Sequence, residues 1–89
     1  MHEITVYLFG SLKEEFGESK KIILRESPCS AFQIKTALYD KFREQQENLT
    51  KEEYILKSCV IACDDSILHN HDEVDINGEI SLLPPVSGG

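Results

Sequence analysis

Three cysteines are the most nucleophilic side chains in this 89-residue sequence, and their spacing limits the chemistry that they could perform. Cys59 and Cys63 lie four residues apart in a short apolar run typical of a strand, too far apart for a comfortable disulfide. No second pair completes a tetrahedral zinc site. Cys29 precedes a predicted helix whose N-terminus could lower the pKa of the thiol, but the sequence places no base beside it. We therefore expect buried structural thiols and no metal site.

The polar segment HNHD at positions 69–72 is a second candidate for chemistry. Its two histidines could hold a divalent ion, but an H-x-H pair among polar residues is more typical of a solvated loop. Phosphate binding is not indicated, because Gly10 and Gly17 lie outside any G-x-x-x-x-G-K pattern. The side chains therefore offer no convincing catalytic constellation.

The remaining reactive group is the main-chain carboxylate of Gly89, at the end of the run LLPPVSGG at positions 82–89. Two prolines fix φ and remove two backbone donors, so a strand that ends at Leu83 cannot continue past them. The Gly-Gly tip could enter a channel too narrow for any side chain. Adenylation by ATP and attack by a sulfur donor would convert the carboxylate to a thiocarboxylate. The alternative is a terminus without a role, as in many domains.

Charge and composition restrict the class of partner. Nine Lys and Arg against sixteen Asp and Glu give a net charge of −7, which argues against nucleic acid or an anionic membrane and favours a basic protein surface. The cysteines are odd in number, no signal peptide precedes Ile4, and no apolar run could span a bilayer. We therefore expect one folded domain in a reducing, cytoplasmic environment.

Hydrophobic periodicity predicts the first elements that would position the tail. Residues 2–9 alternate as in a strand, with Ile4, Val6 and Leu8 on one face. Residues 11–17 are expected to form a short helical turn with Ser11 as its N-cap and Gly17 as its end, and residues 20–25 a second, antiparallel strand.

Residues 31–47 are predicted to form the one long helix. Ser30 and Gln33 have the spacing of a capping box at its start. An apolar stripe begins at Ile34 and recurs at i+3, i+4 and i+8, and Lys35 belongs to the polar remainder. The rest of the chain is expected to form a helical turn at 51–55, a strand at 58–63, a short strand at 66–68, a polar loop with at most one helical turn at 69–76, a turn at 77–78 and a last strand at 79–83.

One amphipathic helix against one sheet predicts a two-layer α+β domain. If the last strand lies beside the first, their apolar residues meet under the helix, and Tyr7, Phe9 and Leu83 form an uncovered patch on the other face. Such residues could be scattered surface apolars. Because the tail leaves the sheet from Leu83, we interpret the patch as a face that docks a partner.

The run LLPPVSGG closely resembles the terminal signature of the molybdopterin synthase small subunit family, the sulfur carriers of molybdenum cofactor biosynthesis. The opening ITVYLFGSL at positions 4–12, followed by FG at 16–17, resembles that family's first strand and turn, and NGEI at 77–80 is similar to its turn into the last strand. The departures lie in the middle. Cys63-Asp64 stands where many relatives read Val-Asn, and the segment 48–57 is longer than usual.

The resemblance implies a β-grasp, ubiquitin-like fold in residues 1–83, a mixed sheet covered on one face by one long helix, with a flexible tail at 84–89. It also implies an E1-like adenylating enzyme that uses ATP, a sulfur-donor protein, and a large synthase subunit that receives the tail in a heterotetramer with two copies of each chain. That large subunit would supply the catalytic side chains for sulfur transfer to cyclic pyranopterin monophosphate.

By the same resemblance, this chain would bind no cofactor, nucleic acid or membrane itself. The implied functional residues are Gly89 as the carrier of the acyl adenylate and thiocarboxylate, with Gly88, Ser87, Val86, Pro85, Pro84, Leu83, Phe9 and Tyr7 as tail and partner-binding residues.

Three alternatives remain open. The first is a sulfur carrier for thiamine thiazole synthesis or tRNA thiolation, although such relatives generally lack Pro-Pro-Val-Ser before Gly-Gly. The second is a ubiquitin-like modifier that is conjugated to lysines through the same activated terminus. The third is a small interaction domain with an inert tail, which requires the eight-residue match to be chance.

Overall fold

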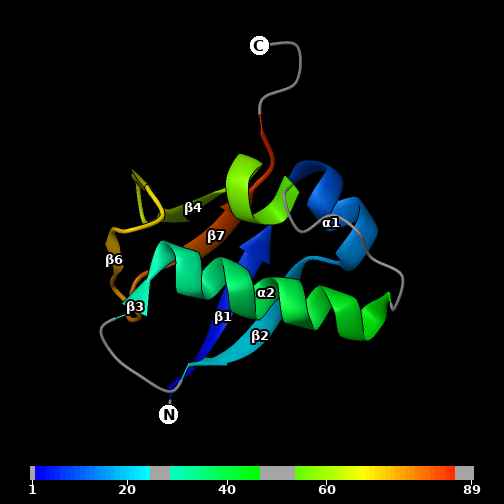
Figure 1. The fold of residues 1–89 in the computed structure, drawn as a ribbon, viewed down its shortest axis with the longest axis horizontal. Helices are drawn as coiled ribbons and strands as arrows, with labels where there is room; N and C mark the ends of the chain where they lie inside the picture. The colour runs from blue at the N-terminus through cyan, green and yellow to red at the C-terminus, as the bar shows by residue number, and fades with distance from the viewer. Residues whose placement is uncertain (1, 25–28, 47–53, 86–89) are drawn as a thin grey trace.

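A mixed sheet of five strands carries helix α2 across one of its faces (Figure 1). The computed structural model describes residues 2–24, 29–46 and 54–85. In chain order, the elements are β1 (His2–Leu8), α1 (Gly10–Phe16), β2 (Ser19–Leu24), β3 (Cys29–Ser30), α2 (Ala31–Gln45), the π-helical turn η1 (Tyr54–Ser58), β4 (Val60–Cys63), β5 (Ser66–Leu68), β6 (Glu73–Val74) and β7 (Ile80–Leu83).

The first and last strands are neighbours in the middle of the sheet. The strand order is β2-β1-β7-β4-β5, in which β1 and β7 run parallel and the other pairs antiparallel. Val6 pairs with Ile80 and Leu8 with Leu82, so that these four side chains meet under α2 and are almost completely buried. The predicted α+β architecture and the central position of the last strand are confirmed.

Helix α2 begins as its sequence predicts. The backbone N–H of Gln33 donates to Ser30 Oγ at 3.2 Å, and the backbone N–H of Ser30 donates to Gln33 Oε1 at 2.7 Å. This capping box satisfies donors that the first helical turn would otherwise leave free. Ile34, Leu38 and Phe42 of the predicted apolar stripe are fully buried against the sheet.

The polar position expected for Lys35 is wrong, because only 3% of this residue is exposed. Its Nζ donates to the carbonyl of Leu56 in η1 at 3.2 Å and to Asn70 Oδ1 at 2.7 Å. The buried face of α2 is wider than the predicted stripe, since Ala31 is also buried and Lys35 lies one turn after it. A buried ammonium is tolerated there because two oxygens from other segments accept its hydrogen bonds.

Helix α1 lies where a short turn was predicted, but it starts differently. Phe9 occupies the N-cap position and no side chain caps the helix, so the expected capping role of Ser11 is wrong. Gly17 ends the helix with φ +107°, as predicted from its lack of a Cβ. Phe16 stacks on Phe42 with ring centroids 4.0 Å apart, which joins α1 to α2.

One strand pair of the structure, between β3 and β6, was not indicated by the sequence. Strand β5 confirms the prediction for 66–68, and β4 confirms the strand predicted at 58–63 but begins at Val60, because Ser58 is the end of η1. Of the helical turn predicted at 51–55, residues 54 and 55 lie in η1 and residues 51–53 lie outside the described residues. Within 69–76 the chain makes one hydrogen-bonded turn, in which the N–H of Asp72 donates to the carbonyl of His69, and β6 then pairs with β3. The carbonyls of Asn70 and Asp72 accept the N–H groups of Phe32 and Ala31, so the turn is held against the start of α2.

Candidate functional site

The root of the tail is packed against the turn between β1 and α1. The parallel register that pairs Leu8 with Leu82 brings Pro84, two residues further on, beside Gly10. Gly10 has φ +59°, and a Cβ built on it would lie 2.9 Å from Cγ of Pro84, closer than atoms in contact can approach. Pro84 and Pro85 are described, whereas the predicted site residues 86–89 lie outside the described residues. The structure thus defines where the tail leaves the sheet.

The sheet face opposite α2 carries an apolar surface beside this root. Tyr7 is 43% and Phe9 48% exposed, and Leu83 is half-buried, so the three predicted docking residues do lie on the uncovered side. Val60 pairs with Leu83 on β4, and Ala62 pairs with Ile67 across β4 and β5, which extends the surface further. We call this set the open-face patch; it consists of Tyr7, Phe9, Val60, Ala62, Ile67 and Leu83.

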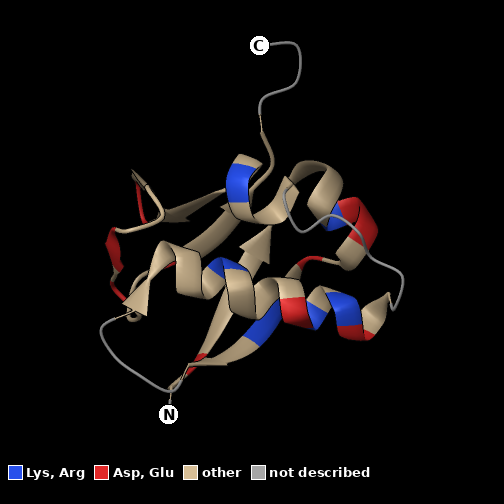
Figure 2. Cartoon of the chain, in the orientation of Figure 1, with Lys and Arg blue, Asp and Glu red and all other residues tan. Residues whose placement is uncertain are grey.

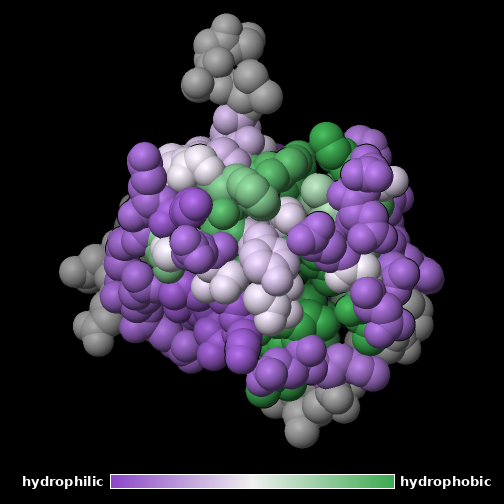
Figure 3. All heavy atoms as spheres, turned by 180° about the vertical axis from the view of Figure 1, so that it is seen from behind, coloured by the Kyte–Doolittle hydropathy of each residue, from purple (hydrophilic) through white to green (hydrophobic). Residues whose placement is uncertain are grey.

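Figure 3 views the molecule from the side opposite α2 and shows hydrophobic residues gathered close to the root of the tail. Ile67 is the most exposed member of the patch, at 62%. Contiguous apolar surface of this kind on a small domain is typical of a protein contact. The root of the tail and the open-face patch therefore lie at the same end of the sheet, so that one partner could contact both.

The cysteines are not organised for chemistry. All three are free and buried, which confirms the predicted buried thiols. Burial raises the pKa of Cys29, so the lowering that the α2 N-terminus could have caused does not occur. Burial raises the pKa of Cys59 to about 11, although the nearby Lys35 opposes this, and it also raises the pKa of Cys63. Near neutral pH these sulfurs are protonated thiols and poor nucleophiles.

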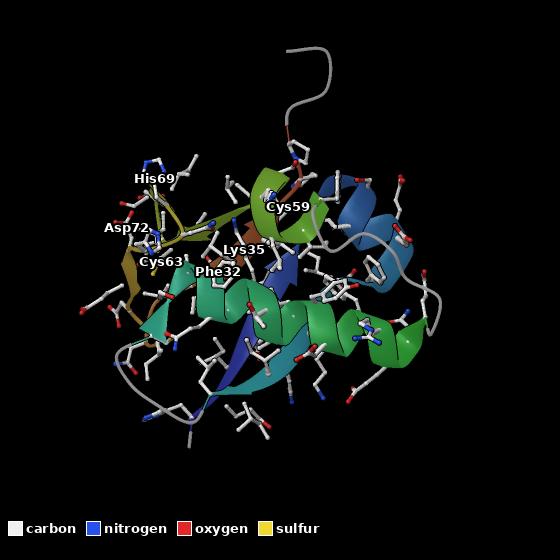
Figure 4. All side chains as sticks on the ribbon, viewed as in Figure 1. Phe32, Lys35, Cys59, Cys63, His69 and Asp72 are labelled. Carbon is white, nitrogen blue, oxygen red and sulfur yellow. The ribbon has the colours of Figure 1, made fainter. Side chains whose placement is uncertain are left out.

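The polar side chains near β5 serve structure. The backbone N–H of His69 donates to Asp72 Oδ2 at 2.8 Å, and Asn70 accepts from Lys35. Figure 4 shows His69 and Asp72 together on their loop, while Lys35 extends from α2 towards η1. In the ranges 2–24, 29–46 and 54–85, no group of three or more His, Cys, Asp or Glu residues could hold a metal ion.

Comparison with known families decides the class of protein to which this tail and face belong. The model of the ThiS family matches residues 6–89, which include the end of β1, all later strands of the sheet and the tail. The chain belongs to the ThiS family. These ubiquitin-like sulfur carriers work with E1-like enzymes and partner proteins. No curated protein matches the chain.

The fold of this ThiS-family chain is also that of a solved structure. Its coordinates are similar to those described as "Crystal structure of SAMP1 from Haloferax volcanii", with a TM-score of 0.70, 17% sequence identity, and coverage of 99% of this chain and 100% of that one. At this identity the likeness concerns the fold alone, and it confirms the predicted β-grasp, ubiquitin-like arrangement. None of the described helices is long and apolar enough to cross a membrane.

Two features of the site in this ThiS-family chain escaped the sequence interpretation. One is Gly10 as the contact of Pro84, which requires the parallel register of β1 and β7. The other is the extension of the patch onto β4 and β5. The alternation of Cys59, Ile61 and Cys63 on the buried face already implied that Val60 and Ala62 point the other way. Only the pairing of β4 with β7 places them beside Leu83.

Proposed function

We propose that this chain is the sulfur carrier subunit of a molybdopterin synthase. In this proposal, the carboxylate of Gly89 is adenylated, converted to a thiocarboxylate and used to donate sulfur to cyclic pyranopterin monophosphate. The observation that carries it is the run LLPPVSGG, which begins in β7, packs its first proline against Gly10 and is included to its last residue in the ThiS family match.

The chemistry resides in a main-chain group and needs activation from outside the chain. A carboxylate oxygen attacks the α-phosphorus of ATP and displaces pyrophosphate, and the acyl adenylate then has AMP as a leaving group. Hydrosulfide supplied by the sulfur donor attacks the carbonyl carbon, AMP departs, and loss of a proton leaves the terminus as a thiocarboxylate. Both steps require access to the terminal carboxyl group without steric bulk, which two glycines provide.

Each part of the described site has a role in this proposal. Pro84 and Pro85 restrict the backbone at the tail root, where the chain leaves the sheet. The open-face patch contacts the adenylating enzyme and, in turn, the large synthase subunit, which supplies the catalytic side chains. The buried cysteines take no part, because burial keeps them protonated.

The family match also accommodates other sulfur carriers, for thiamine thiazole synthesis or tRNA thiolation, and a ubiquitin-like modifier joined to lysines. Each would use the same activated Gly89. The residues Pro-Pro-Val-Ser before Gly-Gly favour the molybdopterin assignment, because carriers of the other pathways generally lack them.

Mass spectrometry tests the proposal directly. The chain is incubated with ATP, the E1-like adenylating enzyme of the same source and a sulfur donor. Its mass should then increase by the difference between one sulfur and one oxygen atom, and the change should map to Gly89. A chain that lacks Gly88 and Gly89 is the control, and it should remain unmodified with an unchanged Tm, because its folded core is intact. Adding the large subunit and cyclic pyranopterin monophosphate should then return the carboxylate. A loaded chain that keeps its sulfur in this last step would exclude the molybdopterin assignment.

A further inference from the structure

The open face contains a second feature, at the end away from the tail. A hollow of about 410 Å³ lies over the starts of β1 and β7, and the argument below concerns five of its lining residues, Glu3, Thr5, Tyr7, Asn77 and Glu79. Tyr7 belongs to both this hollow and the open-face patch. The open face is therefore a continuous surface with an apolar part near the tail and a polar part beyond Tyr7.

Two carboxylates make the polar part acidic. Continuing the register from Val6 and Ile80 places Thr5 beside Glu79, and Glu3 lies two residues before Thr5 on the same face of β1. Both glutamates are exposed, and no ion pair of either is found in the described parts of the chain. Lys21 pairs with Thr5 from β2 but does not line the hollow.

The lining of the hollow matches a guanidinium group better than an ammonium group. An arginine offers a planar fork of donors that two carboxylates can share, and its flat face stacks on an aromatic ring such as that of Tyr7. A lysine would supply one point charge without the fork. Figure 2 shows further acidic residues along the β6 side of the molecule, and the net charge of −7 adds to the attraction of a cation.

We propose that the E1-like adenylating enzyme, which the proposed function already assigns to the open-face patch, adds a second element to this contact, an arginine side chain that enters the hollow. Thr5 and Phe9 are four residues apart on an extended chain, so the two elements of the partner lie about 13 Å apart. The proposal rests on the proposed function, because it concerns the face beside the same tail. It assigns to Glu3 and Glu79 a role in partner selection.

The first experiment needs no partner. Acetyl-arginine amide and acetyl-lysine amide are titrated separately into the ¹⁵N-labelled chain. The arginine derivative should cause saturable shifts at the amides of Thr5, Tyr7 and Glu79, stronger than those caused by the lysine derivative. A Glu3→Gln/Glu79→Gln variant should lose these shifts. Equal responses to the two amides, or shifts that persist in the variant, would overturn the arginine assignment.

The second experiment measures binding of the chain to the purified adenylating enzyme. Glu3→Gln/Glu79→Gln should weaken binding by about five- to tenfold at low salt, with a smaller difference at high salt. The control is Glu14→Gln/Glu73→Gln, which removes the same charge from two exposed positions that do not line the hollow and should change binding less than about twofold. Equal affinities of the two double variants would contradict the proposal.

Sulfur loading separates this proposal from the proposed function. If wild type and both variants are loaded and bind the enzyme equally, the sulfur-carrier role stands and the role of the hollow fails. If wild type is not loaded but binds with the predicted difference between variants, the docking surface stands and the thiocarboxylate role fails.

Discussion

Gly10 determines where the tail can start. Its φ of +59° is a conformation that side chains disfavour, and a Cβ would meet the ring of Pro84 at 2.9 Å. Gly17 has φ +107° and ψ 178°, a conformation that essentially only glycine adopts, but nothing lies within 4 Å of the place where its Cβ would stand. Replacing either glycine with alanine therefore strains the backbone. Only the replacement of Gly10 also requires Pro84 at the tail root to move.

We expect Gly10→Ala and Gly17→Ala each to lower the free energy of unfolding, by about 1–3 kcal/mol, because alanine is strained at both positions. Only Gly10→Ala should also reduce the rate of sulfur loading at Gly89, since it displaces Pro84. Urea unfolding and mass spectrometry measure the two effects. Equal loading rates for both variants would show that the direction of the tail root has no influence.

Cys59 should make stability depend on alkaline pH. Burial raises its folded pKa from 9.0 to about 11, so the folded state keeps a proton that the unfolded chain releases. The stabilisation from this proton is complete below pH 9 and is lost as the pH rises towards about 11. Burial lowers the pKa of Lys35 and Cys59 opposes this lowering, so Lys35 acts on stability in the opposite direction and its pKa also changes when Cys59 is replaced.

The measurement is the free energy of unfolding of wild type and of Cys59→Ala between pH 8 and pH 11. The advantage of wild type over the variant should be constant up to roughly pH 9 and should decrease above it. An advantage that stays constant over the whole range would mean that the buried thiol does not titrate with folding.

Among the elements, α2 is held in place by the polar contact of Lys35 as well as by its apolar face. The Lys35 Nζ joins α2 to the carbonyl of Leu56 in η1 and to Asn70 after β5, and Asn70 Nδ2 donates to the same carbonyl at 3.5 Å. Removing the side chain of either Lys35 or Asn70 leaves a polar group of the other without this hydrogen bond. The three segments therefore depend on one another through a single small network.

A double-mutant cycle of Lys35→Ala and Asn70→Ala should reveal this dependence. Each single substitution is expected to cost about 1–3 kcal/mol, and the double variant about 1 kcal/mol less than their sum, because the second loss leaves fewer unsatisfied groups. Lys41→Ala on the exposed side of the same helix is the control and should cost under about 0.5 kcal/mol. Strict additivity in chemical denaturation would mean that the two side chains act independently.

The elements that the sequence predicted correctly are those whose signal is local. The alternation in β1, the capping box of Ser30 and Gln33, and Gly17 at the end of α1 depend only on neighbouring residues. The pairing of β3 with β6 could not be predicted, because two-residue strands are too short to show alternation. Lys35 was misplaced because its burial depends on acceptors from distant segments.

For the molecule as a whole, the features of the site also divide into those with a local sequence signal and those that depend on distant segments. The tail and the exposure of Tyr7 and Phe9 could be predicted, because strand parity and the Pro-Pro stop are local. The contact of Gly10 with Pro84 and the hollow at Glu3 and Glu79 depend on the register between the first and last strands. No local pattern specifies a register between segments so far apart.

Two exposed phenylalanines allow the docking role of the open face to be tested against a matched control. Phe9 on the open-face patch is 48% exposed, and Phe32 on α2 is 42% exposed. Phe9→Ser should weaken binding to the adenylating enzyme by at least about tenfold, because an aromatic contact in an interface centre is lost. Phe32→Ser should leave binding within about twofold. Equivalent losses from both variants would place the contact elsewhere or indicate a general loss of folding, which Tm distinguishes.

The parallel pairing of β1 with β7 also has a consequence for folding. The two central strands come from opposite ends of the described sequence, so their contact closes the longest loop in the sheet. Such distant pairings form late, whereas the β1–β2 and β4–β5 pairs join segments that are close in sequence. Until β7 is inserted, the sheet is two separate hairpins, and Pro84 has no fixed position beside Gly10. An activating enzyme that recognises both the tail root and the open face would therefore select completely folded chains and ignore nascent or partly unfolded ones.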